Sequence, residues 1–461
     1  MIEQYAQLFP SVNKLTALAI KMTTPLLIEH YSLQSLVLDM HYVKQDTAYL
    51  LEHLSSLAKL TLLNLKEQVT LSYLETVHQA CPQLTNLFLD SAYADPRPST
   101  LFDDAWHDMK LVPCHLHSFS LSCQSGASKW ALWLPYFALK YPHLRHLSFK
   151  NHGTSVSSGL HHAFCEAFRK RCRYLRSIRW DGIAVHGDQA KQLYQPSLRY
   201  IHAHENFSSP KSIFQVPIIA SLITRLSLHQ VKSTKTIELI GSQCGSLNEF
   251  EIQHTKSIDG LMQVVLAHCP ALTLLKMKHT QLTALTNPVA QHTCLNRLVI
   301  EHCSFKQGLF EAISTTCTAL RHVDIIACFQ SDTRGQVRID LSHCQLETLK
   351  INALRARHYY PSCRIRFFAL NQHWFHMNKY SATELETALE LSPIDTEDVN
   401  KLLPLVTEKL LKAWDIEYIK QQAVHTIEDV ESLYYSGLVS IQCSSVKNLF
   451  INNLWCNFLN K

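Results

Sequence analysis

Residues Thr255–Met277 read TKSIDGLMQVVLAHCPALTLLKM. The first half is an apolar, helix-like stretch that runs into Cys269-Pro270, and the second half is Leu272-x-x-Leu275-x-Met277. Apolar residues at helical spacing favour a helix, and the alternation that follows favours a short strand. This segment therefore predicts a helix and a strand within one short stretch of chain.

The same pattern recurs along the chain. We call the first apolar residue of each LxxLxL motif its anchor. From Leu175 onward the anchors are 23–26 residues apart, after a longer gap from Leu144. They are Leu144, Leu175, Leu198, Ile223, Leu247, Leu272, Leu295, Leu320 and Leu346; the more loosely spaced Leu60, Leu84 and Leu116 precede them, and Val12 or Leu15, and Leu33, are candidates for the first two repeats. This period and motif are typical of leucine-rich repeats.

Cysteines mark the corners of these repeats. A cysteine lies three residues before the anchor at Cys81, Cys172, Cys244, Cys269 and Cys317. Just after the strand, where this class of repeat favours Asn or Cys, lie Thr255, Thr280, Cys303 and Cys328. A small, soft side chain fits a tight corner between strand and helix. The predicted fold is an α/β leucine-rich-repeat solenoid of roughly fourteen or fifteen repeats, curved, with a parallel strand ladder on the concave face and helices on the convex face.

Three regions are predicted. Residues 1–352 form the repeat array, with insertions at 91–112, 151–158 and 203–214. In residues 353–440 the regular spacing of the motif is lost. This region holds degenerate repeats or a helical insertion, with amphipathic helices predicted over Ser381–Leu391 and Glu397–Lys412. Residues 441–461 form a final repeat or cap, because Val446-x-x-Leu449-x-Ile451 restores the pattern.

Composition excludes several classes of protein. Only 11 of the 461 residues are glycine and no two glycines are two positions apart, so there is no dinucleotide or phosphate-binding loop. The chain shows no signal peptide, and its most apolar stretch, Val216–Ile223, is too short to span a membrane. Fifteen scattered cysteines are typical of reduced thiols, so we expect a cytoplasmic or nuclear protein. No CxxC, HExxH or GxSxG motif is present, so we expect no metal, cofactor or catalytic residues.

The outward strand positions carry the candidate site. The net charge of +5 permits an anionic partner, and a basic run interrupted by Glu249 and Glu251 follows these positions. It could hold an acidic or phosphorylated protein, or a nucleic-acid backbone, although an ordinary solvated face is an equal alternative. We expect binding to depend on pH if histidines take part. The predicted partner-binding residues are Lys150, Arg179, His202, Arg225, Lys276, Lys278 and Arg297, with His146, His204 and His229 as further titratable positions.

The aromatic and basic stretch 358–380 permits base stacking, but its alternation favours a strand and a flanking loop. Nucleic acid is therefore the less favoured partner.

The repeat from Ile258-Asp259-Gly260-Leu261 through Cys269-Pro270 to Met277 resembles the cysteine-containing leucine-rich repeats of F-box/leucine-rich-repeat proteins. The resemblance implies a substrate receptor of a cullin-type ubiquitin ligase, whose F-box binds the ligase adaptor while the repeats hold a protein substrate. An F-box before the repeats is not found, and Leu403-Pro404 lacks the rest of that pattern. The alternatives are a stand-alone interaction or inhibitor scaffold without ligase recruitment and, less favoured, a nucleic-acid-binding solenoid.

Overall fold

The chain divides into two compact units, Met1–Ile223 and Thr224–Lys461. The computed structural model describes residues 14–17, 34–40, 57–65, 68–94, 112–125, 133–151, 162–181, 192–204, 217–255, 258–283, 285, 291–332, 336–354, 365, 367–377, 391–394, 397 and 438–456.

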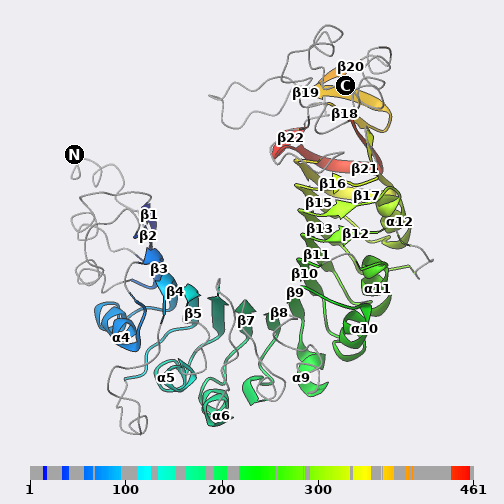
Figure 1. Ribbon diagram of the computed structural model, residues 1–461. Helices are drawn as coiled ribbons and strands as arrows, with labels where there is room; N and C mark the ends of the chain where they lie inside the picture. The colour runs from blue at the N-terminus through cyan, green and yellow to red at the C-terminus, as the bar shows by residue number, and fades with distance from the viewer. Residues whose placement is uncertain are drawn as a thin grey trace, which may run out of the picture. The chain divides into compact units, whose positions relative to one another are not determined.

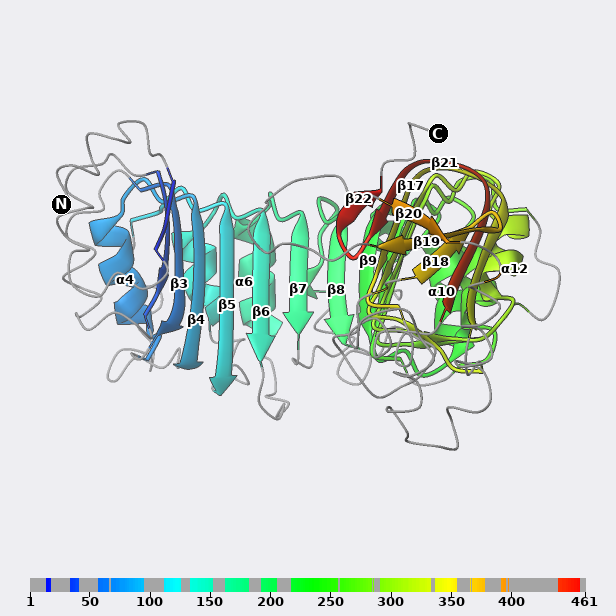
Figure 2. The same cartoon turned by 90° about the horizontal axis from the view of Figure 1, so that it is seen from above.

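In the first unit, each strand pairs in parallel with the strand that follows it in the sequence. Figure 2 shows β3 to β8 side by side and pointing the same way. Helices lie on one face of this ladder (Figure 1). The strands are β1 (Lys14–Ala17), β2 (Ser35–Asp39), β3 (Lys59–Leu65), β4 (Asn86–Tyr93), β5 (Ser118–Ser125), β6 (His146–Asn151), β7 (Ser177–Asp181) and β8 (Tyr200–His204); the helices are α4 (Leu71–Ala80), α5 (Leu134–Lys140), α6 (His162–Arg171) and α9 (Pro217–Leu222).

The second unit has its own parallel ladder, which runs through β9 (Arg225–His229), β10 (Glu249–Gln253), β11 (Leu274–Lys278), β13 (Arg297–Glu301), β15 (His322–Ile326), β17 (Gln336–Asn352) and β21 (Leu438–Ile451). Its helices are α10 (Thr234–Gln243), α11 (Leu261–His268) and α12 (Leu309–Thr316), which Figure 1 shows along one face of the ladder. A second, short ladder joins β12 (Gln281–Leu282), β14 (Ser304–Phe305) and β16 (Phe329–Gln330).

The repeat phase predicted from the sequence is confirmed from Leu84 to Leu346. Phe250, Leu275 and Leu298 are register partners on three neighbouring strands and are buried. Every anchor from Leu144 to Leu346 is at most 2% exposed. Because each repeat contributes the same apolar positions to one shared core, the period in the sequence becomes a continuous buried row.

One anchor was predicted in the wrong register. Leu60 pairs with Leu87, which is the second leucine of its motif, so Leu60 is also a second position. The anchor of that repeat is Leu57, which is fully buried. Leu15, one of the two candidates for the first repeat, lies opposite Leu36 in β2. Leu36 is the second leucine of its motif, so Leu15 is also a second position and not an anchor. Where several leucines lie three apart, the motif alone does not determine the phase.

Cysteines build many of the corners of the repeats. Cys81, Cys244, Cys269 and Cys317 end α4, α10, α11 and α12, each through a backbone N–H that returns to a helix carbonyl, and all four are buried. Beyond the strands, the Cys303 and Cys328 thiols donate to the carbonyls of Met277 and Ile300 in the preceding repeats, at 3.3 Å each. These thiols are structural parts of the corner.

The part of 353–440 that the structure describes is made mainly of strands. β18 (Phe367–Leu370) pairs with β21 in parallel, with β19 (His373–Met377) antiparallel to it and β20 (Leu391–Ile394) antiparallel to β19. Stretch 358–380 thus contains strands, as its alternation indicates. Leu391, predicted at the end of a helix, begins β20; the rest of that helix and, apart from Glu397, the helix predicted over Glu397–Lys412 lie outside the described residues.

Two details differ from the sequence prediction: the course of the last described strand and the starts of the three insertions. β22 (Leu454–Cys456) folds back antiparallel to β21. Ser91–Tyr93 belong to β4, Asn151 to β6, and Ala203 and His204 to β8, so the strands extend into the predicted insertions. Among the helices that the structure describes, none has the length and apolar character needed to span a membrane.

Candidate functional site

We call the side of each ladder away from its helices the outward strand face. In β10 and β11 of the second unit, the first, third and fifth residues are partly exposed on this face while the second and fourth enter the core. In β9, β13 and β15 the third residue is buried as well. Parallel register brings these residues into three rows that cross the repeats. The rows are Arg225, Glu249, Leu274, Arg297, His322 and Thr348; Ser227, Glu251, Lys276, Val299, Asp324 and Lys350; and His229, Gln253, Lys278, Glu301, Ile326 and Asn352.

Ion pairs cross the strands of this face. Arg225 Nε lies 2.6 Å from Glu249 Oε2 on the next strand, and Arg297 Nη2 lies 2.6 Å from Asp324 Oδ2. Asp324 is nearly buried, with 7% of its side chain exposed, whereas Arg297 remains half exposed. Glu249, predicted to interrupt the basic run, therefore neutralises the neighbouring Arg225, as Asp324 neutralises Arg297.

Lys278 is the centre of the third row. Its Nζ lies 3.3 Å from Glu251 and 3.0 Å from Glu301, on the strands before and after its own. Burial lowers the pKa of Lys278, but these two carboxylates outweigh it and hold the pKa above its usual value. Lys276, one row away and half-buried, makes no ion pair with any residue that the structure describes. Of the predicted residues on β9 to β13, Lys276 is thus the cation best placed for a new partner.

The first unit holds the other predicted residues. Arg179 Nη2 lies 3.1 Å from Asp181 Oδ2 on the same strand, and Lys150 is the register partner of Asp181 on β6. Burial raises the pKa of Asp181, but His202, Arg179 and Lys150 outweigh it and hold this pKa below its usual value. The ladder thus gathers Lys150, Arg179 and His202 around one carboxylate.

His202 corrects one expectation. It occupies an outward register position opposite Arg179, yet its side chain is only 1% exposed. Alternation along a strand predicts which side a residue faces but not what covers it. His202 therefore stabilises the Asp181 carboxylate from a buried position and is not a surface contact. The side chain of His204 lies outside the described residues.

A row of neighbouring histidine rings, which the repeat motif did not predict, follows the strands of the second unit. His254, His279 and His302 each occupy the first position after their strand, with φ of 50°, 48° and 51°. Ring centroids are 4.6 Å apart between His229 and His254, 4.2 Å between His254 and His279, and 4.7 Å between His279 and His302. The recurrence of His at one repeat position was the signal in the sequence.

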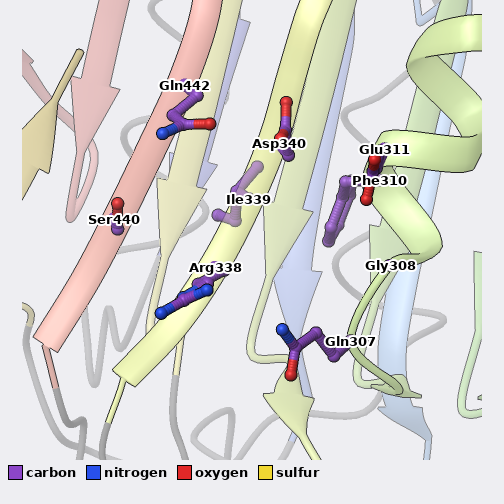
Figure 3. A pocket seen from close by; sticks show the side chains of 9 residues that line it. All are labelled: Gln307, Gly308, Phe310, Glu311, Arg338, Ile339, Asp340, Ser440 and Gln442. Atoms are coloured by element: carbon purple, nitrogen blue, oxygen red, sulfur yellow. The ribbon is translucent and has the colours of Figure 1, made fainter. Parts of the chain in front are cut away.

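A shallow pocket of about 330 Å³ lies between the start of α12 and the strands β17 and β21. Figure 3 shows Arg338, Ile339 and Asp340 on β17, with Ser440 and Gln442 on β21. Gln307, Gly308, Phe310 and Glu311 complete the lining, which contains neither His nor Cys. This lining offers polar contacts but no paired nucleophile and base.

Apart from the exposed Cys294 and the half-buried Cys114, the described cysteines are buried structural thiols. Burial raises the pKa of Cys303 and Cys317 to about 12, so both remain protonated at neutral pH. No disulfide joins the cysteines that the structure describes. Within the same described ranges, no group of three or more His, Cys, Asp or Glu side chains converges as a metal site would require.

The in-register ladders, the repeat period and the one-sided helices define a leucine-rich-repeat solenoid of the α/β class. No protein-family model matches the chain, and no curated protein does. Among solved structures, an internalin from Listeria monocytogenes matches with 14% identity and a TM-score of 0.36, over 72% of this chain and 83% of that one. TLR13, in its complex with ssRNA13, matches with 14% identity and a TM-score of 0.43, over 75% of this chain and 50% of that one.

Proposed function

We propose that this chain is a protein-binding scaffold that recognises its partner through the outward strand face and performs no catalysis. The observation that carries the proposal is the set of cross-strand ion pairs, in which Lys278 bridges Glu251 and Glu301 and Arg297 pairs with Asp324. These charges occupy fixed positions on a hydrogen-bonded ladder. A partner therefore contacts positive and negative charges at defined positions.

Such a surface favours binding for two physical reasons. A rigid ladder loses little conformational entropy on association, so the favourable free energies of many modest contacts can sum to useful affinity. Complementary charge patterns reject wrong partners and fix the register of the right one. The contacts would come from Lys150, Arg179, Arg225, Lys276, Lys278 and Arg297, among which Lys276 is half-buried and outside the ion pairs of the described residues.

The finer proposal is that the chain resembles the substrate-recognition part of an F-box receptor of a cullin-type ubiquitin ligase. The cysteines that end four described helices support the resemblance seen in the sequence. The reduced, buried thiols are also consistent with a cytoplasmic or nuclear location. A stand-alone scaffold without ligase recruitment remains the alternative.

The test is affinity purification of the chain with cross-linking and mass spectrometry, in wild type and in Lys276→Glu. Lys232→Glu, an exposed change of the same charge on the loop before α10, is the matched control. We expect a specific partner that is cross-linked to the outward strands and lost in Lys276→Glu only. Cross-links confined to the helix-covered faces would overturn the proposal. Co-purification of the ligase adaptor would support the finer proposal, and partners without any ligase subunit would contradict it.

A further inference from the structure

A second charged surface lies at the start of the strands in the first unit. His117, Arg145, Arg176 and Arg199 each follow their anchor directly. Their backbones are joined across the repeats: the N–H groups of Arg145, Arg176 and Arg199 donate to the carbonyls of His117, Arg145 and Arg176, at 2.8, 2.7 and 2.9 Å. The four residues therefore form one row, which we call the strand-start row.

The fold itself does not require these charges. In the second unit the same ladder of backbone hydrogen bonds joins the equivalent positions, which carry one arginine and one glutamate among neutral residues: Thr224, Asn248, Thr273, Asn296, Arg321 and Glu347. Helices end beside both rows, so a favourable interaction with helix C-termini would apply equally to both units. The three consecutive arginines are therefore a property of the first unit and not of the repeat.

Within the described residues, the charges of Arg145 and Arg176 are not neutralised. Arg145 and Arg176 are exposed, and no described carboxylate forms an ion pair with either. Burial and then Arg145, His143 and His115 lower the pKa of His117. Burial and then Arg145, Arg176 and His117 lower the pKa of the neighbouring His146. No carboxylate of the described residues acts on either imidazole in the opposite direction.

A row of flat rings lies next to the arginines. His115, His143 and Tyr174 immediately precede their anchors, and their ring centroids are 6.0 and 5.9 Å apart. Tyr174 is 58% exposed, which is unusual for a large aromatic side chain. His115 and His143 are exposed as well, but their separation from the next ring is less than two stacking distances. A nucleobase therefore does not fit between neighbouring rings of this row, which disfavours the base stacking that single-stranded nucleic acids use.

We propose that the strand-start row binds an extended acidic peptide segment of a protein partner. Neighbouring strands of such a hydrogen-bonded ladder are about 4.8 Å apart, and alternate residues of an extended chain are about 6.6 Å apart. The long side chains of Arg and Glu span this difference, so a peptide that crosses the repeats can present a carboxylate to each arginine. Guanidinium groups bind carboxylates through two parallel hydrogen bonds. This surface is separate from the outward strand face, so the inference does not rest on the proposed function.

The experiment uses the full chain and three fluorescently labelled probes in anisotropy titrations. The probes are a twelve-residue peptide of alternating Glu and Ser, its Gln and Ser counterpart, and a twelve-nucleotide single-stranded RNA. We expect the acidic peptide to bind at least about tenfold more tightly than the Gln peptide. Arg145→Glu combined with Arg176→Glu is expected to remove that binding, while Lys232→Glu combined with Lys235→Glu is expected to preserve it.

Three results would overturn the inference. Equal weakening by both double variants would show a response to net charge alone, and tighter binding of the RNA than of the acidic peptide would show a nucleic-acid surface. Retained peptide binding in a folded arginine variant would show a purely structural role for the row. If the Glu variant does not fold, Arg145→Gln with Arg176→Gln removes the charge with less repulsion and gives the same readout.

Discussion

The imidazole rings of His254 and His279 stack face to face with centroids 4.2 Å apart and an interplanar angle of 12°. They occupy the same position in adjacent repeats, so the spacing of the strands sets the spacing of the rings. Two protonated imidazoles at this separation would repel each other. The stack therefore favours neutral histidines.

The first prediction concerns the pH dependence of this stack. Burial and the neighbours His254 and His302 lower the pKa of His279; Lys278 also lowers it, while Glu301 acts in the opposite sense. A histidine whose folded pKa lies below its unfolded value stabilises the fold above pH 6.5 and loses that contribution as the pH falls. We expect a lower Tm at pH 5 than at pH 7.5, measured by thermal unfolding.

His279→Asn is the matching variant, because Asn tolerates the left-handed φ of 48° and does not titrate. It is expected to have a flatter dependence of Tm on pH than wild type. Direct titration of His279 by NMR should give a pKa below 6.5; a higher value would contradict the prediction.

His78 gives a second and larger pH effect. Burial, followed by Lys140, lowers its pKa to about 4 despite the opposing effect of Glu75, and its Nε2 lies 2.7 Å from Tyr141 Oη. The neutral ring stabilises the fold above pH 6.5, and this contribution is lost as the pH falls from 6.5 to 4. At 1.36 kcal/mol per pH unit the loss is about 3 kcal/mol. Urea unfolding of wild type and His78→Gln at pH 7 and pH 4 measures it, and equal losses in both proteins would disprove it.

The buried positions could be predicted from the sequence, whereas the pairing of charges could not. Leu272, Leu275 and Met277 repeat every 23–26 residues because each repeat has the same core to fill. Arg225 and Glu249 lie far apart in sequence and meet only because their strands are in exact parallel register. A slip of one residue would move either side chain to the other face.

The candidate site shows the same limit of prediction from sequence, because contacts between strands are not visible along the chain. Alternation correctly places Arg179 and Lys278 on the outward face, but it also placed His202 there, where the folded chain buries the ring. Along the sequence, Glu249 and Glu251 interrupt a basic run. In the folded chain they form ion pairs with Arg225 and Lys278 on the neighbouring strands. The histidine row was visible in the sequence, although its first member, His229, precedes the common position by one residue.

Gly241 provides a test of helix packing. Gly→Ala inside a helix usually stabilises by about 1 kcal/mol. Here a Cβ on Gly241 of α10 would overlap the backbone carbonyl of His268 at the end of α11. We therefore expect Gly241→Ala to cost about 1–3 kcal/mol in the free energy of unfolding. Gly245→Ala is the control, because no atom lies within 4 Å of its added Cβ, and it should change stability by less than about 0.5 kcal/mol.

The last prediction concerns a buried ammonium group. Lys140 Nζ lies 2.6 Å from Glu75 Oε2, its side chain is only 6% exposed, and Tyr136 donates to the other oxygen of the same carboxylate at 2.6 Å. Glu75→Gln leaves this charge without its counter-ion, because an amide cannot neutralise it. Removing one partner of a buried pair costs about 3 kcal/mol, so we expect Glu75→Gln to unfold at clearly lower urea concentration than wild type.

Glu166→Gln is the matched control for that change. Glu166 and Lys170 form an ion pair of similar length, 2.9 Å, but their side chains are 51% and 66% exposed. Water replaces the lost partner there, so we expect no measurable change in the urea midpoint. If both variants shifted the midpoint equally, burial would not determine the strength of these pairs. If neither did, Lys140 would reach solvent when Glu75 is replaced.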